Sequence, residues 1–136
     1  MKTCLSLNTA KTVAIATLIA LTLACGYSAK STMPPVAGNV PTISALAPNS
    51  ATAGAAGFTM TVNGSSFGSK ATVNFNGAAL TSTFVTANQL TATVPATAIA
   101  TSGTAQVTVT NPGTSGGIYG GGTSPETSTP MSFTIN

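Results

Sequence analysis

Apolar and polar residues alternate with a period of two along most of this chain. The segment FTMTV, for instance, places Phe58, Met60 and Val62 on one face and threonines on the other. The same alternation recurs in four further segments: 71–75, 90–94, 105–109 and 131–135. Strict alternation is typical of strands that bury one face, and threonine suits the half-exposed face. Two weaker patterns, at 42–46 and 82–85, bring the total to about seven predicted strands.

Turn residues, rather than apolar stripes at helical spacing, separate these segments. Asn76-Gly77 has the composition of a type I′ hairpin turn, because both residue types tolerate a positive φ. About seven short alternating strands in a stretch of ~96 residues predict an all-β, antiparallel sandwich. Its core is expected to include the four phenylalanines of the strand patterns: Phe58, Phe75, Phe84 and Phe133.

The first 25 residues have a different pattern, with positive charge followed by an uncharged apolar run. Lys2 and Lys11 precede the run at 12–23, which is shorter than the ~20 residues of a transmembrane helix and suits a signal peptide. The run ends in LTLAC, which resembles the bacterial lipobox, where the cysteine after the cleavage site is acylated. We therefore expect a lipoprotein signal peptide at 1–24 and a lipid on Cys25. Ordinary secretion with cleavage nearby is the alternative.

Lipidation of Cys25 would explain the cysteine content and indicates a location. Cys4 would leave with the signal peptide, so that Cys25 would be the only cysteine of the mature protein. The expected location is the bacterial cell envelope, with the lipid anchor at Cys25 holding the protein on a membrane. Because Gly26 rather than aspartate follows the cysteine, the sorting rule of Gram-negative lipoproteins favours the outer membrane. Residues 25–40 then comprise the acylated cysteine and a flexible linker rich in Gly, Pro and Ser.

The composition leaves few groups for catalysis or ionic binding. The chain has four Lys and Arg together, one acidic residue and no histidine. Acid–base catalysis and metal sites need groups of His, carboxylate or Cys side chains, so we expect no enzyme, no metal and no cofactor. Removal of residues 1–24 would leave Lys30, Lys70 and Glu126, a net charge of 2 − 1 = +1. Nucleic acid is not an expected partner, because its binding needs several cations.

The segments from residue 41 to residue 136 together resemble the IPT/TIG domain, an immunoglobulin-like module. Their order and spacing carry the resemblance, through these residues: Pro41, Ile43, Pro48, Gly54, Gly64, Phe67, Val73, Phe75, Gly77, Leu90, Val94, Pro95, Val107, Val109 and Asn111. The resemblance implies an E-set immunoglobulin-like sandwich, and a fold of this kind implies no particular chemistry. DNA-binding members use basic loops, and Lys70 is the only basic residue near a loop here, so that function is not carried over.

The glycine-rich segment VNGSSFGSK could be taken for a phosphate-binding loop. Such loops lead into a helix N-terminus, whereas the segment that follows here alternates like a strand. We therefore predict that Gly64 and Gly68 let the chain turn between two strands. Phe67 is predicted to anchor this turn in the core.

The segment 111–130 is the strongest candidate for a contact loop. It is far longer than a usual hairpin connection, and Ile118 and Tyr119 stand between groups of glycines. The loop is either a contact site for a glycan, protein or membrane surface, or simply mobile. The leading hypothesis is a non-catalytic module for structural or adhesive protein contacts at the cell surface. The alternative is a surface glycan-binding accessory of a carbohydrate-utilisation system, and the scarcity of charge also predicts self-association at strand edges.

Overall fold

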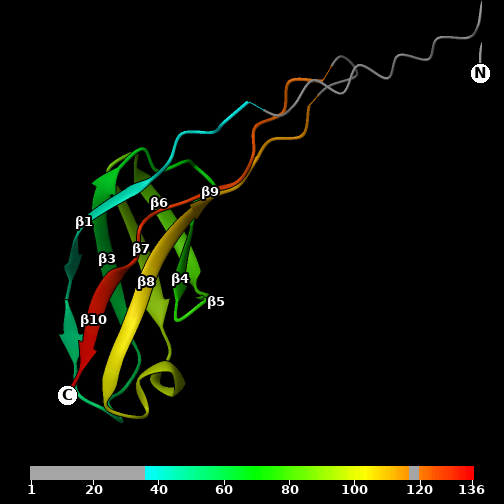
Figure 1. Ribbon diagram of the computed structural model, residues 1–136. Helices are drawn as coiled ribbons and strands as arrows, with labels where there is room; N and C mark the ends of the chain where they lie inside the picture. The colour runs from blue at the N-terminus through cyan, green and yellow to red at the C-terminus, as the bar shows by residue number, and fades with distance from the viewer. Residues whose placement is uncertain (1–35, 117–119) are drawn as a thin grey trace, which may run out of the picture. The chain divides into compact units, whose positions relative to one another are not determined.

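Two packed β-sheets make up the part of the chain that the computed structural model describes, residues 36–116 and 120–136 (Figure 1). The first sheet has the order β1-β3-β7-β6, formed by β1 (Thr42–Ala47), β3 (Phe58–Ser65), β7 (Gln89–Val94) and β6 (Thr81–Thr86). The second has the order β2-β10-β8-β4-β5, formed by β2 (Ser50–Ala51), β10 (Met131–Ile135), β8 (Gly103–Asn111), β4 (Thr72–Phe75) and β5 (Ala78–Ala79). A further short strand, β9 (Glu126–Thr127), pairs with β8, and a 3-10 turn, η3 (Ala96–Ile99), follows β7.

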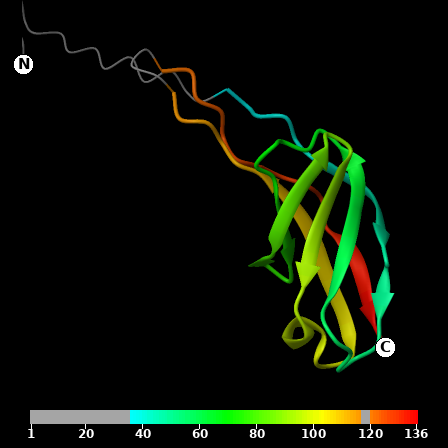
Figure 2. The ribbon, with the colours of Figure 1, turned by 180° about the vertical axis from the view of Figure 1, so that it is seen from behind.

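The strand order is that of an immunoglobulin-like sandwich, which confirms the predicted fold class. The sequence β1-β3-β7-β6 corresponds to the A-B-E-D sheet, and β10-β8-β4 corresponds to the G-F-C sheet. After β1 the chain changes sheets, and β2 pairs in parallel with β10. Figure 2 shows the four-stranded sheet from the outside. The seven predicted segments correspond to the seven longer strands, and the structure adds three two-residue strands, β2, β5 and β9, that carry no periodic pattern.

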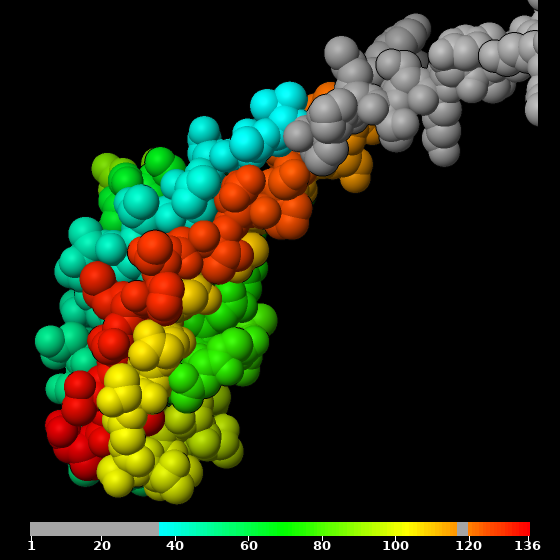
Figure 3. Space-filling view, in the orientation of Figure 1, coloured from blue at the N-terminus to red at the C-terminus, as the bar shows by residue number. Residues whose placement is uncertain are grey.

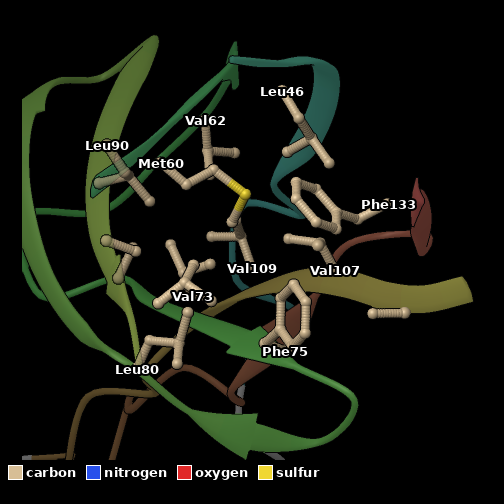
Figure 4. Packing of buried hydrophobic residues seen from close by; sticks show 14 of the residues in the cluster. Leu46, Met60, Val62, Val73, Phe75, Leu80, Leu90, Val107, Val109 and Phe133 are labelled. Carbon is tan, nitrogen blue, oxygen red and sulfur yellow. The ribbon is translucent and has the colours of Figure 1, made fainter. Parts of the chain in front are cut away.

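The alternating residues of the two sheets face each other and form the core. Figure 4 shows the side chains of the four-stranded sheet, among them Met60, Val62 and Leu90, opposite those of the other sheet. The Phe133 ring lies at the centre of an aromatic group, 5.5 Å from Phe75 in an edge-to-face arrangement and 5.8 Å from Phe58 in a stacked one, between ring centroids. Each large apolar side chain that is fully buried in this core stabilises the fold by about 1.5–3 kcal/mol relative to an exposed one.

The prediction that Phe84 belongs to the core is wrong, because its side chain is 38% exposed. Phe84 lies opposite the buried Leu90 and so shares its face of the sheet. However, β6 is the last strand of its sheet, and a bulge shifts the register between Phe84 and Thr86. A side chain at such an edge has neighbours on one side only, so the alternation predicts its face but not its burial.

The Asn76-Gly77 pair forms a two-residue hairpin between β4 and β5. Both residues have a positive φ, 49° at Asn76 and 82° at Gly77, and Phe75 pairs with Ala78 across the turn. The Asn76 side chain adds a contact, because its Oδ1 accepts a hydrogen bond of 2.8 Å from the Gln106 backbone. The hairpin is thereby fixed to the neighbouring strand β8.

Among the described residues, no helix has the length and hydropathy to span a membrane.

Candidate interaction surfaces

Gly64 lies inside β3 rather than in the turn that follows it, so the prediction of a turning role for this glycine is wrong. It pairs with Ile43 at the point where the register between β1 and β3 shifts. A Cβ atom at this position would overlap the Thr42 carbonyl oxygen and would lie 2.5 Å from Cζ of Phe67. The absence of a side chain at Gly64 therefore allows both β1 and the Phe67 ring to approach β3 closely.

The turn between β3 and β4 is fixed by a buried side chain and by hydrogen bonds to two other segments of the chain. The Phe67 side chain is only 4% exposed, and its backbone N–H donates a 2.9 Å hydrogen bond to the Ala87 carbonyl oxygen. Ser66 has a positive φ of 60°, so the chain changes direction just before the buried ring. The Gly68 N–H then donates a 2.8 Å hydrogen bond to Oδ1 of Asn111 at the end of β8.

Asn111 joins three segments that are far apart in the sequence. Besides accepting from Gly68, its Nδ2 donates to the carbonyl oxygens of Asn39, at 2.8 Å, and Ser66, at 2.7 Å. The side chain thus bonds the N-terminal segment, the β3–β4 turn and β8 to one another. In the sequence, Asn111 stands out only as part of the family resemblance. A single asparagine at a strand end carries no signal of these contacts, because none of its partners is close in sequence.

The segment 36–40 is part of the folded structure, which corrects the prediction of a flexible linker up to residue 40. The N–H of Val36 donates to the Gly122 carbonyl oxygen at 3.0 Å, and the Val36 carbonyl oxygen accepts from the N–H of Ser124 at 3.2 Å. Figures 1 and 3 show this segment side by side with the returning arm of the β8–β10 connection. The linker prediction failed here because backbone pairing does not depend on an apolar pattern.

The β8–β10 connection also pairs with itself on both sides of the residues 117–119, which lie outside the described residues. Thr114 and Thr123 exchange two backbone hydrogen bonds of 3.1 Å. Nearer to the sandwich, the side chain of Ser128 is buried and its Oγ accepts from the Val109 N–H at 3.0 Å. We call the paired residues 112–116 and 120–125 the ribbon. The described arms of this connection are therefore hydrogen-bonded to each other and to β8. Whether the connection is a contact site stays a prediction.

A groove of ≈ 740 Å³ opens where the ribbon, the segment 36–40 and the β3–β4 turn meet. This end of the sandwich, which we call the loop end, carries the B–C and F–G connections in immunoglobulin terms. The groove is lined mainly by glycines and by short hydroxyl and amide side chains, with one cation, Lys70. Ser69, Thr114 and Ser124 supply hydroxyl groups. These groups can bond to a polar ligand, and among the lining residues that the structure describes none carries an aromatic ring on which a sugar could stack.

The outer edge of β6 is the second candidate surface. The strand ends its sheet, its sequence TSTFVT has no charged residue, and Phe84 and Val85 are 38% and 47% exposed. Natural sheets protect such edges with charges, prolines or bulges. Of these devices β6 has only the bulge next to Val85. It therefore presents backbone groups and apolar side chains to which another strand could add.

The described residues contain little other chemistry. No group of three or more His, Cys, Asp or Glu side chains that could hold a metal occurs in residues 36–116 and 120–136. Lys70 borders the groove, and Glu126 lies in β9 rather than in a mobile loop. The predicted lipidation site Cys25 and the predicted contact residues Ile118 and Tyr119 lie outside the described residues. Their roles remain predictions.

The fold and these surfaces define a class: a small immunoglobulin-like sandwich whose loop end and strand edge are open to contacts. The chain belongs to the IPT/TIG domain family, whose model matches residues 41–130, a shorter stretch than the predicted domain at 41–136. Domains of this family are immunoglobulin-like modules for protein interaction. No curated protein and no solved structure matches the chain significantly.

Proposed function

We propose that this protein is a non-catalytic lipoprotein of the bacterial cell envelope that presents one IPT/TIG sandwich for structural or adhesive protein contacts. The family supports an interaction role. The basic start, the apolar run and the LTLAC motif support an anchor at Cys25, and Gly26 supports the outer membrane as its place. The Ile118-Tyr119 pair, between groups of glycines, is proposed as a further contact.

The observation that carries the proposed protein contact is the uncharged outer edge of β6. A partner strand that adds to an exposed sheet edge gains main-chain hydrogen bonds, and side-chain contacts make the addition selective. On β6 these contacts would come from Phe84 and Val85, which are exposed beside the free edge. Both residues lie on the edge strand itself, so a strand added to this edge would run beside them.

Site-specific photocrosslinking in intact cells tests this contact. A photoreactive residue is placed at Val85 and, as a matched control, at Thr104, which is exposed on β8 in the other sheet. The proposal expects a discrete crosslinked protein from position 85 and none from position 104. Equal crosslinking from both positions, or none from 85, would refute a specific contact at this edge.

The anchor is tested separately by Cys25→Ala. Labelling of cells with palmitate should mark the wild-type protein and not the variant, and the variant should leave the membrane fraction. Unchanged membrane retention of Cys25→Ala would refute the lipid anchor, whatever the result at β6.

The hydroxyl and amide groups of the groove suggest a second function, glycan binding as an accessory to carbohydrate utilisation. Its hydroxyl and amide groups could donate to and accept from sugar hydroxyls, and its volume of ≈ 740 Å³ is of the size of small-ligand sites. A glycan array probed with the detergent-solubilised full-length protein tests this function. Binding that is lost on changing Ser69 and Lys70 to Ala would support it, and a blank array would exclude it.

A further inference from the structure

We propose that the loop end faces the lipid bilayer and rests on its surface, with Val36, Val40 and Lys70 as contacts. The partner is thus the headgroup region of the membrane in which the protein is anchored. This inference rests on the proposed function, because it needs the anchor at Cys25. It goes further by assigning an orientation and a membrane-contacting surface to the sandwich.

The direction of the chain at Val36 is the first argument. Val36 forms a parallel bridge with Thr123, so residues 36–40 and 123–127 both run toward the sandwich. The described chain therefore begins at the loop end, and the connection to Cys25 joins the sandwich there. The two hydrogen bonds between Val36 and the ribbon fix this point of departure.

The length of the connection is the second argument. Cys25 and Val36 are separated by 36 − 25 = 11 residues, and a chain of this length spans at most about 38 Å when fully extended. As a flexible coil it would span about 18 Å. The nine residues of β8 place the opposite end of the sandwich about 27 Å farther along the strands. Because residues 36–40 pair with the ribbon, the chain between Cys25 and the folded part is shorter than the predicted linker. The loop end is therefore the end of the sandwich that the anchor holds near the lipid.

The chemistry of the loop end is the third argument. Val36 and Val40, which are 64% and 53% exposed, are two of the four large exposed hydrophobic residues in the described chain. Lys70 lies at the same end, beside the hydroxyl-lined groove. Exposed apolar side chains at the same end of the sandwich as a lysine match the boundary between acyl chains and phosphodiester headgroups. The third and fourth exposed residues, Phe84 and Val85, belong to the β6 edge and leave that edge available to proteins.

A depth measurement on the full-length lipoprotein tests the orientation. With Cys25 blocked by its thioether, an introduced cysteine is the only thiol that reacts with a fluorophore. Ser69→Cys places the label on the groove, and Ser102→Cys places it in the exposed turn before β8, at the opposite end. Both proteins are reconstituted into phosphatidylethanolamine–phosphatidylglycerol vesicles that contain lipids with a nitroxide on the headgroup.

The expected result is quenching at least about threefold stronger at position 69 than at position 102. Val36→Ser combined with Val40→Ser should reduce quenching at 69 toward the level at 102, while circular dichroism remains that of the folded sandwich. Equal quenching at the two positions, or stronger quenching at 102, overturns the inference.

Flotation of the same vesicles separates this inference from the proposed function. Wild-type protein that fails to float with the vesicles overturns both, because no anchor is then present. Protein that floats but is quenched equally at both positions overturns only the orientation. Replacing phosphatidylglycerol with phosphatidylcholine then tests Lys70: quenching at 69 should fall in the wild type and stay unchanged in Lys70→Gln.

Discussion

Replacing Gly64 with alanine tests the close approach of β1, β3 and the Phe67 ring. The added Cβ would overlap the carbonyl oxygen of Thr42, which is backbone and cannot rotate away, and would lie 2.5 Å from Cζ of Phe67. Gly64 is not among the residues with a positive φ, so the effect of Gly64→Ala isolates this overlap from backbone strain.

The magnitude follows from what must move. Overpacking of a close contact costs about 1–3 kcal/mol, and partial expulsion of the buried Phe67 ring would add about 1–2 kcal/mol of lost burial. We expect Gly64→Ala to lower the free energy of unfolding by about 2–5 kcal/mol. For a domain of this size the melting temperature should fall by roughly 10–25 °C.

Urea unfolding followed by circular dichroism measures this change, with thermal melting as a second readout. Gly54→Ala is the matched control, because Gly54 has a φ of +73° but nothing within 4 Å of the position that a Cβ atom would take. Only backbone strain of about 1–2 kcal/mol is expected there. If Gly64→Ala is destabilised no more than Gly54→Ala, the overlap argument is refuted.

Three further predictions concern the Asn111 contacts, the core and the β6 edge. Asn111→Ala should lower the free energy of unfolding by about 1–3 kcal/mol and speed amide exchange at Gly68. Asn111→Asp keeps an acceptor for the Gly68 N–H but places a carboxylate oxygen against the carbonyl oxygens of Asn39 and Ser66, so it should be destabilised at least as much as the alanine variant. Unchanged exchange at Gly68 in the alanine variant would contradict the role of Asn111. Phe133→Ala should cost about 3–5 kcal/mol in urea unfolding, because Phe133 is fully buried against Phe58 and Phe75; a loss below about 1 kcal/mol would count against a well-packed core. Sedimentation of the detergent-free Cys25→Ala protein at high concentration should show self-association that Val85→Lys abolishes without changing the melting temperature, and a strictly monomeric parent would disprove it.

The sequence alone determined the fold class, the positions of the long strands and the β4–β5 hairpin. These features depend on local properties: alternation sets the face of a residue in a strand, and Asn76-Gly77 tolerates the φ values of a tight turn. The buried Met60 and Val62 followed directly from that pattern. The resemblance to the IPT/TIG family likewise depended on the order of residues along the chain, which the sequence contains in full.

Only the tertiary structure decided how the edges and the loop end are built. Phe84 has the right face for the core but lies on an edge strand, and Gly64 is needed for an approach of β1 rather than for a turn. Asn111 and the segment 36–40 acquire their roles from hydrogen bonds to residues that are distant in sequence. Exposure at an edge, close backbone contacts and long-range hydrogen bonds all depend on which segments meet in space, and a local periodicity carries no information about that.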